Sequence, residues 1–374
     1  MNIYLDNAAT TPIDPLVVKE IIPILKDCYG NPSSIHAHGR TARSHIEKAR
    51  KKIAQYFNSS PSEFFFTSGG TEADNMILRC AVEDLKVERI ITSPLEHHAV
   101  LHTAEYLNNH GVDVDYVKIN HQGKVDLNHL EELLKEEKKT LVSLMHGNNE
   151  IATLLPLKEV GNLCRNYHAY FHSDTVQTMG HYAFDFKACN IHFATCSAHK
   201  FHGPKGVGFL YLDKEIKINP MITGGAQERS LRAGTENIYG IVGLAKALEL
   251  AYDNLEKHQK HIQGLKSYMI QLLKKEIPGV IFNGDSESEG SLYTVLNVCF
   301  PSTEMDEMFL YSLDIEGISA SGGSACSSGT NIGSHVLNAI GAPMDRPSVR
   351  FSFGRFNTKE EVDRCMEVLL KIYK

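Results

Sequence analysis

The chain has 374 residues, of which 42% are hydrophobic and 22% charged, and its formal net charge is −7. This composition is that of an ordinary globular protein, and the length accommodates one large or two moderate domains. The acidic charge without a basic cluster argues against direct binding of nucleic acid. The sequence has no apolar run near the roughly 20 residues of a membrane span and no signal-peptide pattern, so we expect a cytoplasmic protein without membrane contact.

Strands and helices alternate over most of the chain. A first helix is predicted after Asp14 and Pro15, because an N-cap aspartate followed by proline favours a helix start. The other predicted elements are strands at 4–5, 64–67, 89–92, 112–117, 141–145, 169–172, 192–196 and 207–212, and helices at 46–57, 72–85, 98–108, 127–136 and 157–167. Strands of nearly continuous apolar residues between helices indicate a mainly parallel sheet with helices on both faces.

After Gly240 the pattern changes. Residues 241–275 are predicted as one long helix that leads to a second domain. The elements predicted beyond it are strands at 280–282, 294–300 and 349–353, a helix from Met305, and a last helix from Thr358, whose Thr-x-x-Glu spacing forms a capping box. We therefore expect an α/β fold, with a large domain at 14–258 and a smaller α+β domain formed by 1–13 and 259–374.

The eight cysteines are scattered without a Cys-x-x-Cys pair, so neither a disulfide framework nor a zinc site is predicted. The histidine pairs also lack a third ligand at a suitable spacing, and we expect no metal. Most of the cysteines lie in apolar segments, where a small buried side chain is the expected role. Cys326 differs because it lies in a polar, glycine-rich stretch at 319–331, where its thiol is reachable.

A polar loop, SAHKFHGPKG at 197–206, separates two apolar strands. Lys200 in this loop is a candidate for forming a Schiff base, because such a site can shield the amine and lower its pKa. The alternative is an ordinary surface loop with solvated lysines. This stretch alone leaves both interpretations open.

A second loop, TSGGTEADN at 67–75, lies between a predicted strand and a predicted helix. Its glycines leave backbone amides accessible, and a threonine hydroxyl and the helix dipole can help to hold a phosphate. It matches neither a dinucleotide fingerprint nor a P-loop. A tight strand-to-helix turn is the alternative.

Polar residues at three further positions have possible roles in a binding site. Asp174 follows a strand and could pair with a protonated ring nitrogen, His97 precedes a helix and could stack on a ring, and Arg350 could clamp a carboxylate. The alternatives are a helix cap for Asp174, a capping or surface histidine for His97, and an internal salt bridge for Arg350. Taken together with Lys200, these residues are the components of a pyridoxal phosphate enzyme that acts on an amino acid.

Short motifs along nearly the whole chain strengthen this interpretation. They occupy residues 4–10, 30–34, 66–75, 96–97, 148–150, 199–200, 203–206, 232–235, 323–326 and 350–355. With these motifs in this order, the sequence resembles the cysteine desulfurases of the class V aminotransferase family. The length of the loop before Ser334 resembles the longer-loop branch, which serves iron–sulfur cluster assembly and tRNA thiolation.

The resemblance implies the type I fold of pyridoxal phosphate transferases and a role for each matching residue. Lys200, Cys326 and His97 would be catalytic, with Lys200 holding pyridoxal 5'-phosphate and Cys326 accepting the sulfur. The other implied cofactor ligands are Gly70, Thr71, Ser197 and His199 at the phosphate, Asp174 at the ring nitrogen, and Gln177 and Asn149 near the ring hydroxyl. Asn149 and Arg350 would bind the substrate, and Thr235 would reach the phosphate of a neighbouring subunit, which implies a homodimer with shared active sites.

The implied reaction converts L-cysteine to L-alanine and leaves a persulfide on Cys326, which a scaffold protein or a tRNA-thiolation enzyme would receive. A selenocysteine lyase or an aminotransferase for small amino acids remains an alternative of the same fold. A pyridoxal phosphate-binding scaffold without activity is an alternative of another class. Ala198 and Ala152 stand where the family usually has glycine, so each adds a methyl group near the site.

Overall fold

We describe the protein from a computed structural model that covers residues 2–304, 306–322 and 333–373. Cys326, the predicted sulfur acceptor, therefore lies outside the described residues, as do the rest of the 323–326 motif and the loop up to residue 332. Within the described ranges, no helix is long and apolar enough to cross a membrane.

A seven-stranded sheet with the order β2-β8-β7-β6-β5-β3-β4 forms the centre of the molecule. Its strands are β2 (Phe64–Thr67), β3 (Arg89–Thr92), β4 (Asp113–Tyr116), β5 (Thr140–Ser143), β6 (Tyr170–Asp174), β7 (Phe193–Ser197) and β8 (Gly208–Leu212). The pairs from β7 to β4 are parallel, whereas β8 runs antiparallel to both β2 and β7. The prediction of a mainly parallel sheet is confirmed, with β8 as the antiparallel strand.

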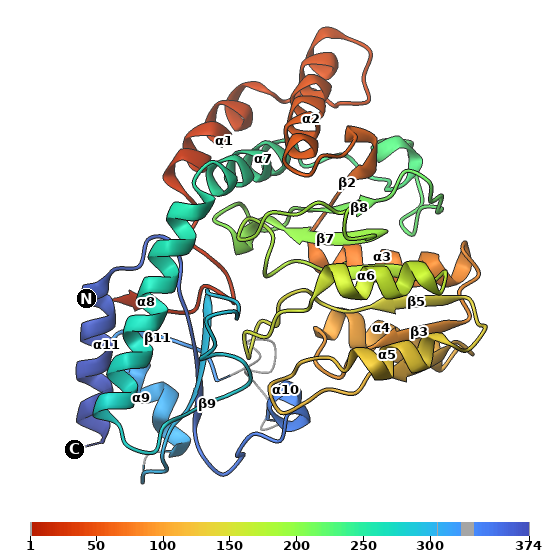
Figure 1. Cartoon of the computed structure of the whole chain (residues 1–374). Helices are drawn as coiled ribbons and strands as arrows, with labels where there is room; N and C mark the ends of the chain where they lie inside the picture. Colours follow the sequence, from red (N-terminus) through yellow and green to blue (C-terminus); the bar gives the residue numbers. More distant parts are fainter. Residues whose placement is uncertain (1, 305, 323–332, 374) are drawn as a thin grey trace.

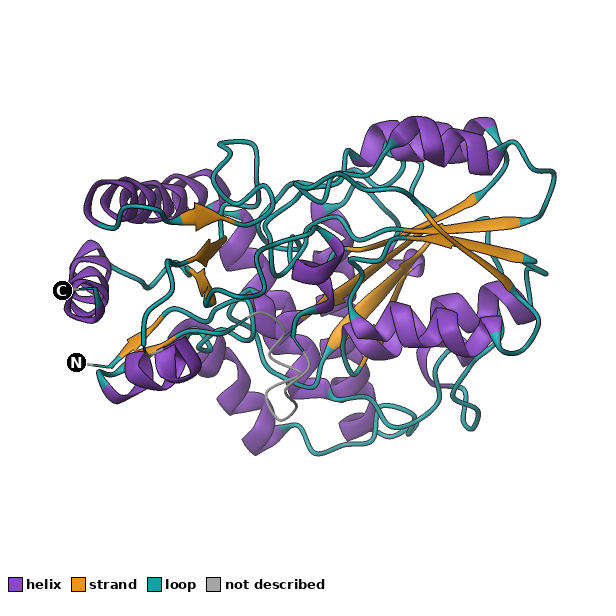
Figure 2. Ribbon diagram, turned by 90° about the horizontal axis from the view of Figure 1, so that it is seen from below, coloured by secondary structure: helices purple, strands orange, loops and turns teal. Residues whose placement is uncertain are grey.

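Helices cover both faces of this sheet (Figures 1 and 2). They are α1 (Pro15–Asp27), α2 (Ala37–Tyr56), α3 (Gly70–Glu83), α4 (His98–Asn108), α5 (Leu127–Leu134), α6 (Leu157–Asn166) and α7 (Ile238–Tyr252). Successive strand residues enter opposite cores, as Phe64 and Phe66 join one cluster of buried side chains and Phe65 joins the other. Burial on both faces explains why these strands are apolar along their whole length.

The prediction of one helix over 241–275 is wrong. Helix α7 ends at Tyr252, and a separate helix, α8, spans Leu255–Glu276. Asn254 lies between them in a non-helical conformation, and its side-chain amide donates a hydrogen bond to the carbonyl of Leu250. An asparagine that competes for backbone partners in this way interrupts a helix. The break spans only two residues, so the apolar periodicity continues across it.

Helix α8 leads into a C-terminal part with its own hydrophobic core. This part contains β9 (Ile281–Phe282), β10 (Val295–Cys299), α9 (Phe309–Ile315), β11 (Ile318–Ser319), α10 (His335–Ala339), β12 (Ser348–Ser352) and α11 (Lys359–Ile372). Strand β1 (Ile3–Tyr4) pairs with β11, so the N-terminal strand joins the C-terminal part. The predicted capping box is confirmed, because the side chains of Thr358 and Glu361 accept hydrogen bonds from each other's backbone amides.

Ala152, which stands where the family usually has glycine, has a backbone conformation that favours glycine. Its φ angle is 61°, in the left-handed region that glycine adopts most easily. The residue is fully buried, and its methyl group packs in a small cluster with Ala8, Leu292 and Val295. The packing of this methyl group offsets part of the conformational cost.

Candidate active site

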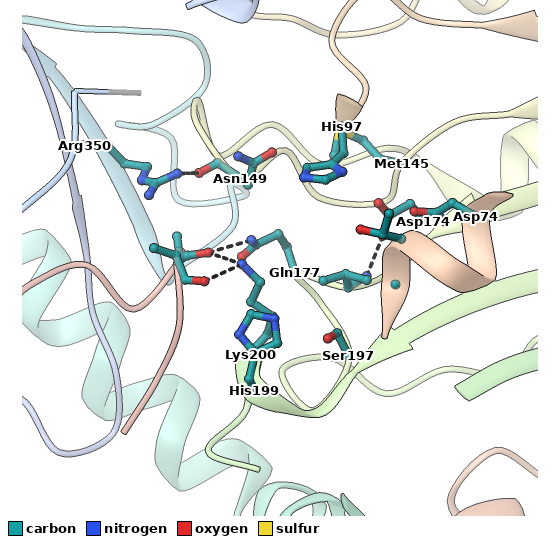
Figure 3. Close-up of a pocket in the computed structure, with 15 residues that line it drawn as sticks. Asp74, His97, Met145, Asn149, Asp174, Gln177, Ser197, His199, Lys200 and Arg350 are labelled. Carbon is teal, nitrogen blue, oxygen red and sulfur yellow. Dashed lines mark hydrogen bonds between the residues drawn. The ribbon is translucent and has the colours of Figure 1, made fainter. Parts of the chain in front are cut away.

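A pocket of about 270 Å³ lies where the carboxyl ends of the central strands meet residues from both chain ends (Figure 3). Its lining residues are Ala8, Ala9, Gly70, Thr71, Asp74, His97, Met145, Asn149, Asp174, Val176, Gln177, Ser197, His199, Lys200 and Arg350. The structure thus brings together every predicted site residue except Cys326 and Thr235. Cys326 is outside the described residues, and Thr235 is exposed and does not line this pocket.

Lys200 lies in a turn that begins directly after β7. Its ammonium group donates hydrogen bonds to the carbonyls of Ala8 and Ala9, with lengths of 2.5 and 2.9 Å. The turn is closed by a bond from the amide of Gly203 to the carbonyl of Ala198, and a Cβ atom at 203 would come within 2.8 Å of that carbonyl. The lysine amine is therefore held at one position in the pocket by two segments distant in sequence.

Asp174 is the last residue of β6, at the carboxyl edge of the sheet. Its Oδ1 accepts hydrogen bonds from the amide of Val176 at 2.8 Å and from the hydroxyl of Thr195 at 3.3 Å. Burial and the nearby carboxyl of Asp74 raise the pKa of Asp174 to about 6, and His97 opposes the shift. A buried carboxylate with few donors is well suited to accept a proton-bearing nitrogen of a ligand.

The N-terminus of α3 faces the pocket through Gly70 and Thr71. The N-cap residue, Gly69, offers no side chain to the first amides of the helix, so these donors and the helix dipole are available for an anion. A Cβ atom at Gly70 would approach Val176 Cγ2 to 2.6 Å, which shows how closely the helix end fits against the loop after β6.

His199 completes this end of the pocket beside Ser197. Its Nδ1 lies 3.1 Å from the hydroxyl of Thr10. Burial and, to a smaller extent, the charges of Lys200 and Lys205 lower the pKa of His199 to about 4. The imidazole is therefore neutral at neutral pH and can serve as a hydrogen-bonding group without adding charge.

His97 is the N-cap of α4. Its Nδ1 accepts a hydrogen bond of 3.1 Å from the amide of Ala99, so the proton of the neutral ring is on Nε2. Burial lowers the pKa of His97, and the charge of Asp174 opposes this effect. His97 therefore caps α4 through Nδ1 and also places its ring in the pocket.

Arg350 lies in β12 and is buried. It donates hydrogen bonds of 2.8 Å to Asp6 Oδ1 and 3.1 Å to the carbonyl of Asn149. Within the described part of the chain, its Nε has no hydrogen-bond partner. The internal salt bridge that the sequence left open is present, and the Nε–H of Arg350 has no partner within the described part of the chain.

Sequence reasoning missed several residues of this pocket, most notably Asp74. Asp74 follows Gly70 by four positions in α3, so the helical repeat places both on one face of the helix. That spacing was a signal that could have identified it. The carbonyls of Ala8 and Ala9 gave no such signal, because backbone atoms carry no sequence pattern.

The fold and the pocket define an α/β enzyme in which a lysine amine and a guanidinium group share one cavity. The sequence model of aminotransferase class-V matches residues 3–365. The chain is 42% identical over 374 residues to the protein named cysteine desulfurase IscS from Dictyoglomus turgidum. The alignment covers 99% of this chain and 94% of that relative. The chain therefore belongs to the class V aminotransferase family, among its cysteine desulfurases.

Solved structures agree with this placement. A NifS-like protein superimposes with a TM-score of 0.92 and 39% identity, covering 100% of this chain and 99% of the other. A structure described as SspA in complex with cysteine gives a TM-score of 0.83 and 30% identity, covering 96% of this chain and 100% of the other. The predicted type I fold is confirmed, and pyridoxal phosphate is the general cofactor of this family.

Proposed function

We propose that this protein is a pyridoxal phosphate-dependent cysteine desulfurase that forms L-alanine from L-cysteine and transfers the sulfur to Cys326. The observation that carries the proposal is that Lys200 and Arg350 line one pocket, so an amine and a carboxylate-binding group are available to one amino acid. The relative solved with cysteine supports the choice of substrate.

The residues of the pocket fit pyridoxal phosphate. The uncapped N-terminus of α3, together with Ser197 and His199, is suited to the phosphate, and Asp174 is suited to the ring nitrogen. The remaining proposed contacts are His97 on the ring face, Gln177 and Asn149 near the ring hydroxyl, and Lys200 as the covalent anchor. When bound, the cofactor supplies an electron sink for the carbon next to the substrate nitrogen.

The protein's own groups then bind the substrate and move protons. Arg350 binds the substrate carboxylate, which fixes the position of the Cα–H bond. Lys200, once neutral, takes the Cα proton, since its amine is already confined to the pocket by Ala8 and Ala9. His97 holds a proton at Nε2 that it can exchange with the substrate. The thiolate of Cys326 attacks the substrate sulfur and forms the S–S bond of the persulfide, the substrate Cβ–S bond breaks, and its electron pair stays with the carbon skeleton that leaves as L-alanine.

The test measures alanine and sulfide released from L-cysteine. We expect activity in the wild type and in Lys205→Ala, which removes an exposed lysine of the same loop, and none in Lys200→Ala. Cys326→Ser is expected to abolish sulfur transfer, and mass spectrometry of the wild type should find an added sulfur atom on Cys326. Unchanged turnover in Cys326→Ser would overturn the proposal in favour of an aminotransferase. Bound cofactor without any turnover would indicate a scaffold, and turnover of selenocysteine alone would indicate a lyase.

The proposal extends to a homodimer that passes sulfur to an acceptor protein for iron–sulfur cluster assembly or tRNA thiolation. Large apolar side chains are exposed along α1 and the loop after it, among them Leu16, Leu25, Tyr29 and Ile35. Exposed large apolar side chains on one helix and the loop after it favour contact with another protein surface. The exposed position of Thr235, away from the pocket of its own chain, is compatible with a role in a neighbouring subunit.

A further inference from the structure

Helix α10 attaches the C-terminal part of the chain to two loops of the pocket (Figure 1). Its buried apolar side chains form one cluster with Leu95, in the loop after β3, and with Ile151, in the loop after β5. Leu95 lies two residues before His97, and Ile151 lies two residues after Asn149. Because His97 and Asn149 both line the pocket, α10 packs against the loops that present them.

Two polar contacts hold the start of α10 on the same loops. The hydroxyl of Ser334, the N-cap of α10, donates a hydrogen bond of 2.6 Å to Oε2 of Glu150. The Nε2 of His335 lies 3.1 Å from the carbonyl oxygen of Glu96, and since a carbonyl only accepts, this nitrogen carries the proton. Glu96 and Glu150 are each the direct neighbour in sequence of a residue that lines the pocket.

The contact between Ser334 and Glu150 is well suited to hold α10. The two residues are only 7% and 1% exposed, and the bond length is typical of a hydroxyl that donates to a carboxylate. The Ser334 oxygen also accepts a bond of 3.1 Å from the amide of Leu337, so one hydroxyl both caps the helix and binds Glu150. Loss of this donor would deprive a buried carboxylate of a partner, which costs free energy.

Glu150 itself is held in place by the loop around it. The side-chain oxygen of Asn148 accepts a hydrogen bond of 2.8 Å from the Glu150 amide, and Asn297 of β10 donates one of 3.0 Å to the Glu150 carbonyl. The carbonyl of the preceding residue, Asn149, accepts a hydrogen bond from Arg350. Ser334 is therefore bound to a fixed point of the pocket wall, directly connected to the two residues proposed to bind the substrate.

The proposed sulfur acceptor, Cys326, precedes Ser334 by eight residues. A chain of eight residues spans at most about 29 Å when fully extended, so a fixed Ser334 restricts the positions open to the Cys326 thiol. A reactive group confined near its target by a short tether has a raised effective concentration there. If the start of α10 came away from the pocket wall, the thiol would be distributed over a larger volume and would meet the substrate less often.

We infer that Ser334 and Glu150 are positioning residues for the sulfur transfer. Their hydrogen bond keeps Cys326 within reach of the pocket and takes no part in the proton transfers at Lys200. The inference rests on the proposed function for its purpose, whereas the attachment of α10 exists without substrate or cofactor.

The test uses variants of the full-length protein. Ser334→Asp keeps an oxygen that can cap α10 but sets a second carboxylate against Glu150, so the bond between them should be lost. Adding Glu150→Gln to Ser334→Asp restores a hydrogen bond with the donor reversed, because the glutamine amide can donate to the aspartate. Glu150→Gln alone keeps an oxygen that accepts from Ser334 and should resemble the wild type. Tyr268→Phe is the matched control, since it removes a hydroxyl-to-carboxylate bond to Asp363 between α8 and α11.

Three measurements separate the attachment of α10 from the chemistry. Hydrogen–deuterium exchange of the cofactor-free protein should show faster uptake at residues 335–340 in Ser334→Asp and wild-type uptake in the other variants. In the loaded enzyme, mass spectrometry of rapidly quenched samples gives the rate of persulfide formation on Cys326. This rate should fall at least about tenfold in Ser334→Asp, as expected for loss of a charge-assisted hydrogen bond, and recover in the double variant. Exchange of the Cα proton of L-alanine with solvent should keep its wild-type rate throughout, because it needs Lys200 but no sulfur acceptor.

Unchanged uptake at α10 in Ser334→Asp would overturn the inference, as would a double variant that does not recover. An equal fall in persulfide formation and in alanine exchange would also overturn it, since that pattern indicates general damage to the fold. Should Ser334→Asp fail to fold, Ser334→Ala removes the donor without adding a charge and should change uptake and persulfide formation in the same directions. If uptake at α10 responds as expected but the wild type forms neither persulfide nor alanine from cysteine, the proposed function fails and the attachment of α10 stands.

Discussion

Arg350 shows how one buried side chain can serve both the fold and the ligand. Its contacts with Asp6 and Asn149 hold β12 against the N-terminal segment and the loop after β5, while its Nε remains available. A guanidinium group can make such divided contacts because its five donors point in fixed directions. A lysine has no equivalent geometry at this position.

We therefore predict that Arg350→Lys raises the KM for cysteine about a hundredfold, which corresponds to the ~1.5–3 kcal/mol typical of a charge-assisted hydrogen bond. The turnover number should fall less, because the reacting groups remain in place. Steady-state kinetics with cysteine provides the measurement. Arg346→Lys is the matched control, since Arg346 bonds the carbonyls of Phe300 and Gly279 outside the pocket. Equal effects on KM in both variants would contradict the assignment.

At the residue scale, the sequence allowed those functional groups of the site that belong to side chains to be predicted. Lys200, Asp174 and the α3 motif lie together because each is at or directly after the carboxyl end of a strand of the same sheet, and these ends converge at one edge. The partners of those side chains could not be predicted. The salt bridge between Arg350 and Asp6 joins side chains far apart in the sequence, and the groups that hold Lys200 are the backbone carbonyls of Ala8 and Ala9, so both depend on the fold.

At the scale of elements, α8 carries an unusual interior residue. Lys266 is fully buried, and its amine donates hydrogen bonds to the hydroxyl of Ser291 at 2.7 Å and the carbonyl of Leu292 at 3.0 Å. Burial lowers the pKa of Lys266 to about 7, although Asp285 opposes the shift. A neutral amine still has two N–H donors, which match the two acceptors. The helix is thus tied to the segment before β10 without a buried charge at alkaline pH.

This arrangement predicts a pH-dependent stability. Between the folded pKa of about 7 and the ordinary lysine value of 10.5, the unfolded chain binds a proton that the folded chain has released. The free energy of unfolding should therefore rise with pH in this window, by at most roughly 1.4 kcal/mol per pH unit. Denaturant unfolding of the wild type and Lys266→Met measures it, because the difference between them removes the contributions of other groups. Lys260→Met, an exposed change in the same helix, should leave the slope unchanged. A constant difference between wild type and Lys266→Met would show that Lys266 stays charged in the fold.

The sequence predicted the types of most elements correctly but not every connection between them. Caps at Asp14 and Thr358 identified helix starts because the capping chemistry is local. The break at Asn254 was missed because the helical periodicity resumes after two residues. The antiparallel direction of β8 was also not specified, since a fully buried strand has the same apolar composition in either direction.

At the scale of the whole molecule, the two main hydrophobic cores are consistent with two domains. The division at 14–258 stays a prediction. Helix α10 belongs to the C-terminal part of the chain but contacts the large sheet's side of the molecule. The hydroxyl of its N-cap, Ser334, donates a hydrogen bond to the carboxylate of Glu150, and Leu337 packs with Leu95 and Ile151. The end of the segment that contains Cys326 is thereby attached to the side of the molecule that holds the pocket.

For the proposed dimer we predict that Leu25→Glu produces a monomer, because a charge on an exposed apolar face makes its burial in an interface costly. Sedimentation velocity should give the mass of two chains for the wild type and one for the variant. Lys19→Glu, an exposed change in the same helix that is already polar, serves as the control. A monomeric wild type would contradict the prediction directly.

The N-terminal segment has a consequence for the order in which the protein becomes functional. Its strand β1 pairs with β11 near the other end of the chain. The carbonyls of Ala8 and Ala9, which accept hydrogen bonds from Lys200, lie 192 and 191 residues before that lysine. During synthesis these first residues leave the ribosome early but wait for nearly the whole chain before their strand partner exists. A nascent or truncated chain thus lacks a finished anchor for the lysine. The Lys200 amine therefore reaches its final position only after the N-terminal segment has docked, late in the folding of the chain.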